Sequence, residues 1–371
     1  MPPSSSHTRA DVPNFVLSRP TDHVSAFGAD VRFDTVDAAR AALYNRTHEH
    51  IVGALPFDPA GPAALTAPAR VVRRDVRWQP DAPTLPAVTI DGFDPEPDEH
   101  VRRVATAIRV LSDPHATLAK VVLARTVILR ASECIDPLDL LTRLVAADPG
   151  SNGLLVDLSP AGPPYTGAHL IGSSPELLVR KSGSAVICHP LAGSAPRAAD
   201  AAEDRANGQM LAASAKDQRE HAFVVDAMAT ALAPLCSDLD VPATPTLTQT
   251  PNMWHLGTRI VGTVRDPETT ALDLAVALHP TPAVCGTPTA AAREFILANE
   301  GDRGFYAGAV GWCTGAGDGE WMVGIRCAEL SADGLTIRAS AGGGIVSGSD
   351  PQLELAETSA KLRTILSALG R

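Results

Sequence analysis

Apolar residues recur at two different spacings along this chain, and the two spacings predict a mixture of strands and helices. Runs rich in β-branched and apolar residues predict strands at 120–129, 153–158, 171–179, 185–189, 321–330 and 335–341. Apolar residues at helical spacing predict helices at 37–44, 99–111, 137–147, 201–235 and 351–369. Because strands and helices do not alternate regularly, this order favours an antiparallel-rich α/β sandwich over a doubly wound parallel sheet.

The strength of this patterning changes along the chain. Residues 1–20 are polar and Pro-rich and predict a disordered, frayed tail. Residues 21–100 are weakly patterned, whereas the clear signals lie in 100–365. A length of 371 residues allows one large α/β domain or two ordinary ones. Since no linker clearly divides the chain, we expect a single domain over 21–371.

The net charge of −11 argues against partners that are bound through basic surfaces. Nucleic acids and anionic membranes are such partners, so we expect the chain to bind neither. The first residues lack the apolar region of a signal peptide, and no apolar run reaches the ~18 residues of a membrane span. The six cysteines form neither a CxxC pair nor a zinc-binding pattern, which predicts buried, reduced thiols. These features together favour a cytoplasmic enzyme.

Two pairs of carboxylates are the first candidate for chemistry. Glu354 and Glu357 lie three residues apart near the start of the last helix, and Asp217 and Glu220 have the same spacing within 201–235. Each pair therefore shares one helix face. Such acids are usually solvated, and near a helix start the macrodipole alone favours them. If the two helices instead converge, the four carboxylates predict a site for a hard cation such as Mg²⁺.

Single charged residues in apolar surroundings are the second candidate. Arg326 lies in the predicted strand 321–330 on a face of small and apolar residues, so it needs an anionic partner. Lys120 opens an apolar strand and is either a lysine that reaches water or, if enclosed, a general base. Glu176 is either a solvated loop acid or, if enclosed, a general acid. His255 lies among apolar residues, where a structural role is the more common one.

A run of glycines precedes the last helix. Residues 342–344 follow the predicted strand 335–341 and come before Ser349-Asp350-Pro351, a strong helix start. Consecutive backbone N–H groups in a glycine loop can bind a carboxylate or a phosphate. A tight turn explains the run equally well, and the run fits neither a Walker loop nor a GxGxxG pattern.

These pieces occur together in an order that resembles the chorismate-utilising enzymes, a family that includes anthranilate synthase, aminodeoxychorismate synthase, salicylate synthase and isochorismate synthase. The similar segments are KVVLAR (120–125), GSSPELLVR (172–180), HPLAGSAPR (189–197), KDQREHAFVVD (216–226), WHLGTRIVG (254–262), LHPTPAVCGTP (278–288), DRGFYAGAVGW (302–312), GDGEWMVGIRCAEL (317–330) and AGGGIVSGSDPQLELAETSAKL (341–362). The resemblance implies one chorismate-binding α/β domain with two large, mainly antiparallel sheets packed as a sandwich and helices outside.

The resemblance also implies the identity of the site residues. It implies a Mg²⁺ site made by Glu220 and Glu357, with Asp217 and Glu354 nearby or acting through water. The ion would bind the ring carboxylate of chorismate. The enolpyruvyl carboxylate would be held by Arg326, Tyr306 and the backbone at Gly343 and Gly344. The implied substrate site is completed by Gly193, His255 and Thr281.

Lys120 indicates which reaction of the family to expect. The aminating members lack the lysine at the start of the KVVLAR segment, whereas the members that add water have it. The resemblance therefore implies the isochorismate synthase reaction. Lys120 would take a proton from water that attacks ring C2, and Glu176 would protonate the C4 hydroxyl as it leaves. We expect no glutaminase subunit for this reaction, and we expect a monomer.

Three alternatives stay open at this point. A salicylate synthase also carries the lysine and goes on to eliminate pyruvate, although the HPTPA stretch and the GWCTGAGDGEW loop favour the isochorismate synthases. An aminating subunit is disfavoured by Lys120. A non-catalytic chorismate-binding protein would need neither Lys120 nor Glu176. Isochorismate feeds menaquinone, siderophore and salicylate synthesis, and the sequence does not distinguish these pathways.

Overall fold

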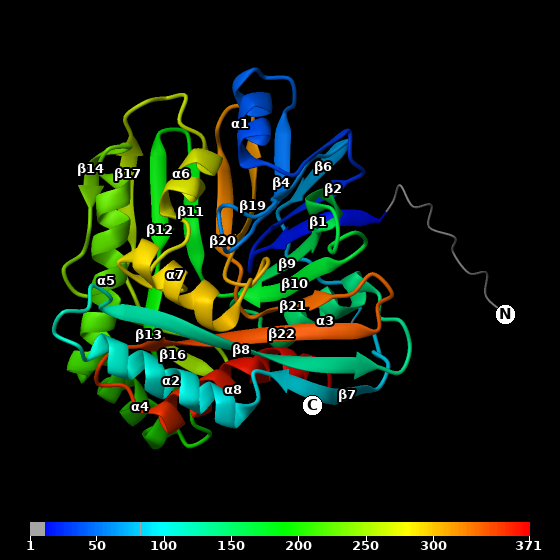
Figure 1. The fold of residues 1–371 in the computed structure, drawn as a ribbon. Coiled ribbons are helices and arrows are strands. Elements are labelled where there is room, and N and C mark those ends of the chain that lie inside the picture. The colour runs from blue at the N-terminus through cyan, green and yellow to red at the C-terminus, as the bar shows by residue number, and fades with distance from the viewer. Residues whose placement is uncertain (1–11, 82) are drawn as a thin grey trace.

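Two large β-sheets dominate the computed structural model, which describes residues 12–81 and 83–371. One sheet has ten strands and the other nine, and a third sheet has three strands. Neighbouring strands pair antiparallel, as β8 does with β22 and β19 with β20. In Figure 1 the nine-stranded sheet stands upright at the upper left, while β8 and β22 of the ten-stranded sheet run across the lower half.

The strand order shows how distant segments become neighbours. The ten-stranded sheet has the order β18 (Gly286–Thr287), β8 (Lys120–Ala131), β22 (Thr336–Ile345), β21 (Cys327–Leu330), β10 (His169–Ser174), β9 (Asn152–Asp157), β1 (Pro13–Ser18), β2 (His23–Phe27) and β6 (Arg70–Arg74), with β7 (Val88–Asp94) also paired to β8. The nine-stranded sheet has the order β14 (Cys236–Asp240), β17 (Ile260–Val264), β12 (Ala185–His189), β11 (Leu177–Ser182), β20 (Gly319–Val323), β19 (Ala309–Thr314), β4 (His50–Leu55), β5 (Ala64–Ala67) and β3 (Val31–Phe33). The small sheet has the order β13 (Leu191–Pro196), β16 (Met253–Gly257) and β15 (Thr246–Gln249).

Helices cover the sheets from outside. Their bounds are α1 (Val36–Tyr44), α2 (Pro97–Leu111), α3 (Pro137–Ala147), α4 (Ala201–Ala213), α5 (Ala215–Leu232), α6 (Ala271–Leu278), α7 (Thr289–Glu300) and α8 (Pro351–Ala368). On the ten-stranded sheet, α8 buries its apolar face against β22 and β8, and α3 buries its apolar face against β9 and β10. α5 and α6 do the same against the nine-stranded sheet.

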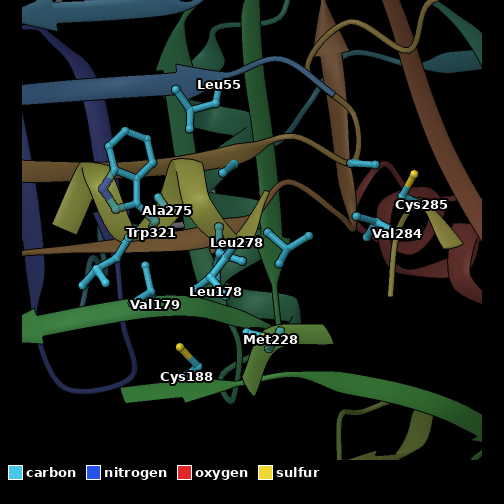
Figure 2. Close-up of a cluster of buried hydrophobic side chains, with 14 of the residues drawn as sticks. Leu55, Leu178, Val179, Cys188, Met228, Ala275, Leu278, Val284, Cys285 and Trp321 are labelled. Atoms are coloured by element: carbon cyan, nitrogen blue, oxygen red, sulfur yellow. The ribbon is translucent and has the colours of Figure 1, made fainter. Parts of the chain in front are cut away.

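Three apolar clusters hold these layers together. Figure 2 shows part of the first, in which Trp321 of β20, Leu178 of β11 and Leu278 of α6 are buried together. A second cluster lies between the two large sheets, where Phe15 of β1 meets Val310 of β19. Each large side chain buried in this way contributes about 1.5–3 kcal/mol. The interior cluster therefore holds the two sheets face to face, and the predicted α/β sandwich with outer helices is confirmed.

The predicted N-terminal tail is wrong for the residues that the structure describes. Pro13–Ser18 forms β1, which pairs with β2 on one side and β9 on the other. Phe15 and Leu17 in this strand are each 1% exposed, so they belong to the core. The apolar run Phe15–Leu17 has only three residues and is too short to signal a strand, so the strand depends on its pairing with β2 and β9. Residues 1–11 of the predicted tail lie outside the described residues.

The predicted helix 201–235 is two helices. Ser214 ends α4 and caps α5, where its hydroxyl accepts a hydrogen bond from the backbone N–H of Asp217. A serine followed three residues later by an acid is a helix-start signal inside the Ala-rich run. The break matters for the site, because it places Asp217 in the first turn of α5 and Glu220 one turn later.

The predicted strand 321–330 is also interrupted. β20 ends at Val323 and β21 begins at Cys327, and Arg326 between them has a φ of 51°. The prediction that Arg326 lies in a regular alternating strand is therefore wrong. The predicted glycine loop is wrong as well, since Gly342, Gly343 and Gly344 lie within β22 and pair with β8.

The predictions drawn from composition can also be compared with the structure. All six cysteines are free, and five of them are buried, but Cys134 is exposed. Within residues 12–81 and 83–371, no helix has both the length and the apolar character that a membrane crossing requires.

Candidate active site

A cavity lies where β8 and β22 meet α5, α8 and the small sheet. Among the predicted site residues, it brings together Glu176, Gly193, Glu220, His255, Tyr306, Arg326, Gly344 and Glu357. Lys120 contacts Glu220 at its edge. Five predicted residues are not in its lining, namely Lys120, Asp217, Thr281, Gly343 and Glu354. Segments that are far apart in sequence therefore converge on one polar hollow.

Glu176 is a buried acid whose surroundings keep it protonated. It follows Pro175 in the connection between β10 and β11 and is 2% exposed. Burial raises the pKa of Glu176 to about 8, even though a backbone hydrogen bond from Leu191 and the charge of Lys120 act in the opposite direction. At neutral pH this carboxyl group holds its proton, which is the state that a general acid needs. The alternative of a solvated loop acid is wrong.

Lys120 is an enclosed lysine and does not reach water. The residue is 0% exposed, and its Nζ lies 3.0 Å from Oε1 of Glu220. The two atoms form an ion pair without hydrogen-bond geometry, so Nζ keeps its hydrogen-bonding capacity for another group. An ammonium buried alone would cost several kcal/mol, and the Glu220 carboxylate offsets this. The structure thus places a lysine nitrogen beside the cavity that also contains Glu176.

Arg326 is a buried cation at the other side of the cavity. It is 6% exposed, and within the described residues its guanidinium makes no side-chain hydrogen bond. Burial lowers the pKa of Arg326, while Tyr306 and the more distant carboxylates oppose this change. Burial also raises the pKa of Tyr306, which keeps its phenol a neutral hydrogen-bond donor. A buried guanidinium facing a cavity without a bonded acid is suited to an anionic ligand.

Three smaller predicted residues differ in how close they lie to the cavity. His255 lines it, its Nε2 has no hydrogen-bond partner in the described structure, and burial holds the pKa of His255 well below its usual range. Gly193 forms a bulge in β13 with a φ of +78°, and a Cβ atom there would lie 3.1 Å from Cβ of Asp217. Thr281 is buried, and its backbone carbonyl accepts a hydrogen bond from the N–H of Val284, but it does not line the cavity.

The glycines of β22 are needed for close approach of two acids. A Cβ atom on Gly344 would overlap Oε1 of Glu220, and one on Gly343 would lie 2.9 Å from Oε2 of Glu354. Successive residues of a strand face opposite sides. Glu220 therefore approaches β22 from the cavity, and Glu354 approaches it from the side of α8. The glycines make room for carboxylates and do not form the loop that the sequence predicts.

Each of three predicted metal-binding glutamates is paired with a lysine. Glu220 lies 3.0 Å from Lys120, Glu354 lies 3.2 Å from Lys216, and Oε1 of Glu357 lies 2.6 Å from Nζ of Lys361. Across residues 12–81 and 83–371, no three acidic, histidine or cysteine side chains are arranged to hold a metal ion. Burial is the largest cause of the raised pKa of Glu354, and the charge of Glu357 raises that pKa further. The acids therefore repel one another.

The pKa of Asp217 supports the same view of these carboxylates. Burial raises it most, and the charges of Glu220 and Glu357 raise it further. In addition, Oε2 of Glu354 is buried without a hydrogen-bond partner among the described residues. Carboxylates that repel one another and retain free oxygen atoms are chemically suited to a hard divalent cation. Of the four, only Glu220 and Glu357 line the cavity.

The sequence analysis missed Lys361. It lies one turn after Glu357 on α8, lines the cavity, and donates a hydrogen bond to the carbonyl of Gly342 at 2.9 Å. Burial alone would raise the pKa of Glu357, but Lys361 and a hydrogen bond from Ser194 outweigh it and lower the pKa. The signal was present in the sequence, because residues i and i+4 of a helix share a face.

Comparisons with known proteins show the family to which the chain belongs. Residues 72–370 match the sequence model of a family described as chorismate binding enzyme. A Mycobacterium tuberculosis protein that is provisionally named an isochorismate synthase is 54% identical over 360 residues, which cover 96% of each chain. The isochorismate synthase of Bacillus subtilis is 45% identical over 333 residues, or 86% of this chain and 80% of that one.

A solved structure extends the similarity to the fold. It is that of a Bacillus anthracis protein provisionally described as a 2,3-dihydroxybenzoate-specific isochorismate synthase. It superposes with a TM-score of 0.88 at 38% identity and covers 98% of this chain and 97% of that chain. The matched sequence, the shared fold and the converging site residues together show that this chain belongs to the chorismate-binding enzyme family.

Proposed function

We propose that this protein is an isochorismate synthase, which converts chorismate to isochorismate with the help of Mg²⁺. The observation that supports this most strongly is the pairing of a buried lysine with a buried, protonated glutamic acid at one cavity. Lys120 is 0% exposed, and burial raises the pKa of Glu176 to about 8. An acid and a base held at one site are what a displacement of one hydroxyl by water requires. The names of the relatives from Mycobacterium tuberculosis and Bacillus subtilis support the same activity.

The proposed reaction uses the side chains of four residues of this chain. Lys120, as the neutral amine, takes a proton from the water whose oxygen bonds to ring C2. The ring double bonds shift, the C4–O bond breaks, and Glu176 supplies the proton with which the C4 hydroxyl leaves as water. Arg326, with the neutral phenol of Tyr306, would hold the enolpyruvyl carboxylate, because a buried guanidinium can bind a carboxylate in a bidentate way. After the reaction Lys120 returns its proton and Glu176 regains one.

We further propose that Glu220 and Glu357 hold the Mg²⁺, with Asp217 and Glu354 acting through water. The support is that the first two line the cavity, and that the acids repel one another while one oxygen of Glu354 has no partner in the described part of the chain. A bound magnesium ion would supply positive charge for the ring carboxylate of the substrate. Lys120, Lys216 and Lys361 form ion pairs with Glu220, Glu354 and Glu357.

The activity can be tested directly by incubating the purified protein with chorismate and separating the products by chromatography. Isochorismate as the only product, formed with Mg²⁺ and not with EDTA, is the expected result. Salicylate together with pyruvate would instead assign the protein to the salicylate synthases. Turnover that needs ammonia would assign it to the aminating members, and an absence of any turnover would favour a chorismate-binding protein.

Loss of the guanidinium at Arg326 is expected to weaken substrate binding. Arg326→Ala should raise KM for chorismate about 10- to 100-fold, because each hydrogen bond between charged groups contributes roughly 1.5–3 kcal/mol. Arg326→Lys keeps the charge but loses the fork, so its KM should lie between those of Arg326→Ala and the wild type. Steady-state kinetics measures both. A KM near that of wild type in the Ala variant would remove Arg326 from the substrate site.

Loss of one carboxylate charge at Glu357 is expected to weaken metal binding. Glu357→Gln should raise the Mg²⁺ concentration needed for half-maximal activity by about tenfold or more, since Mg²⁺ is held by few protein carboxylates. Titration calorimetry with Mg²⁺ checks this without substrate. Glu294→Gln, on the exposed face of α7, is the matched control and should bind Mg²⁺ like wild type. Unchanged affinity in Glu357→Gln would exclude this assignment.

A further inference from the structure

A buried ion pair outside the cavity contacts three parts of its wall. Glu300 ends α7, and Arg303 follows three residues later; their side chains are 8% and 4% exposed. Nη2 of Arg303 lies 2.7 Å from Oε2 of Glu300, and Nε donates to the same oxygen at 2.8 Å. Neither residue lines the cavity described above. The pair is therefore a candidate for a role that acts through other residues.

The contacts of this pair are with backbone groups of β8 and of the turn after α6. Nη2 of Arg303 donates to the carbonyl of Val122 at 2.8 Å, and Nη1 donates to the carbonyl of Val284 at 3.0 Å. The other oxygen of the pair, Oε1 of Glu300, accepts the N–H of Ala124 at 2.7 Å. Val122 and Val284 both line the cavity.

The position of these contacts explains why the pair is needed. β18 pairs with β8 only at Lys120 and Val121, and β7 pairs with it only from Thr126 onward. Between these two strands the free edge of β8 has backbone groups with no strand to bond to, and buried backbone groups need partners. Glu300 and Arg303 fill this gap with their side chains. The gap begins two residues after Lys120.

The same arginine also contacts the aromatic side of the wall. Its guanidinium carbon lies 4.7 Å from the ring centroid of Phe57 and 6.0 Å from that of Tyr306. The backbone N–H of Tyr306 donates to the carbonyl of Arg303 at 3.2 Å. Val122, Val284 and Tyr306 belong to three separate segments, and Arg303 contacts all three.

We propose that Arg303, neutralised by Glu300, is a positioning residue that fixes the cavity wall formed by Val122, Val284 and Tyr306 relative to Lys120. This inference rests on the proposed function for its catalytic consequence. A planar guanidinium can donate to two carbonyls and an acid at once, whereas an ammonium cannot do so with the same geometry. Loosening the wall should displace the substrate from its reactive position, and a displacement of about 1 Å can reduce a rate about 10²-fold.

The test compares Arg303→Lys with two other variants. Arg303→Lys keeps the charge opposite Glu300 but cannot bridge both carbonyls, so kcat should fall about 10- to 100-fold while KM changes less than about threefold. Glu300→Gln keeps an acceptor for the N–H of Ala124 and leaves the two carbonyl contacts of Arg303, so kcat should stay within about threefold of wild type. Arg293→Lys, whose arginine pairs with Asp58 at 3.7 Å on the surface, is the matched control.

A purely structural role predicts a different result. Arg303→Lys would then lower the melting temperature but keep the wild-type kcat at temperatures where it is folded, and that outcome would overturn the proposal. Hydrogen–deuterium exchange gives a readout that does not depend on the reaction. Residues 281–286 should exchange faster in Arg303→Lys than in Arg293→Lys, even if the wild type acts on another substrate. Equal exchange in the two variants would also overturn the proposal.

Discussion

Lys120→Met is expected to reduce kcat for chorismate by about 10²–10⁴-fold while substrate binding is kept. General base catalysis contributes a factor of this size, and methionine fills a similar volume without a proton acceptor. Lys120 Nζ is fully enclosed at the cavity and has no hydrogen-bond partner among the described residues. The measurement is steady-state turnover combined with titration calorimetry for chorismate binding. Turnover near that of wild type would remove Lys120 from the mechanism.

A second buried lysine provides the control for this prediction. Lys181 in β11 has a side chain that is 3% exposed and lies 3.5 Å from Asp318. Lys181→Met thus removes a buried lysine that does not line the cavity, and it should keep kcat. Because Lys120→Met also leaves Glu220 buried without its partner, its melting temperature should fall. Adding Glu220→Gln should restore stability but not turnover, which separates the two effects.

Glu176→Gln is expected to reduce kcat about 10²–10⁴-fold and to change how activity depends on pH. The wild type needs the protonated carboxyl group, so its activity should fall as pH rises through about 8, the pKa to which burial raises Glu176. Glutamine does not ionise, so the remaining activity of the variant should lack this alkaline fall. Glu329→Gln is the control, because burial also raises the pKa of Glu329 although it does not line the cavity. If the activity of Glu176→Gln still fell at alkaline pH, the fall would have to come from the ionisation of another group.

The same substitution should increase stability at neutral and alkaline pH. The pKa of Glu176 is about 8 in the folded protein against 4.5 for the unperturbed group. A raised folded pKa gives a stability contribution that is complete below pH 4.5 and is lost as pH rises to 8, by about 1.4 kcal/mol per pH unit. Urea unfolding of wild type and Glu176→Gln at pH 5 and pH 8 measures the difference. Between pH 5 and pH 8, the free energy of unfolding of the variant should rise relative to that of the wild type.

Elements with strong local signals could be predicted from the sequence. The strand over Lys120–Ala131 is rich in β-branched and apolar residues, and α8 begins at the predicted Asp350-Pro351 start. What could not be predicted depends on partners that are distant in sequence. β1 is a strand because it pairs with β2 and β9, and Gly342–Gly344 continue β22 because β8 lies beside them. A glycine run in the sequence indicates a flexible backbone. It does not show that the glycines make room for the side chains of Glu220 and Glu354.

The site residues follow the same division. The family resemblance identified Glu176 and Arg326, and the structure shows that both are buried and line the same cavity. The interruption that turns Arg326 toward this cavity, with its positive φ, has no clear signal in the alternating pattern around it. Arg303 was not singled out, because its role depends on backbone carbonyls of Val122 and Val284 that only the fold brings together.

Oxygen from water should appear at C2 of the product if the proposed displacement is correct. The decisive measurement is the early reaction of chorismate in H₂¹⁸O with Mg²⁺, analysed by mass spectrometry of the products. The account predicts isochorismate that carries one ¹⁸O atom in its C2 hydroxyl, without release of pyruvate. Unlabelled isochorismate would show that the C4 hydroxyl migrates without attack by water, and salicylate with pyruvate would show a different reaction altogether.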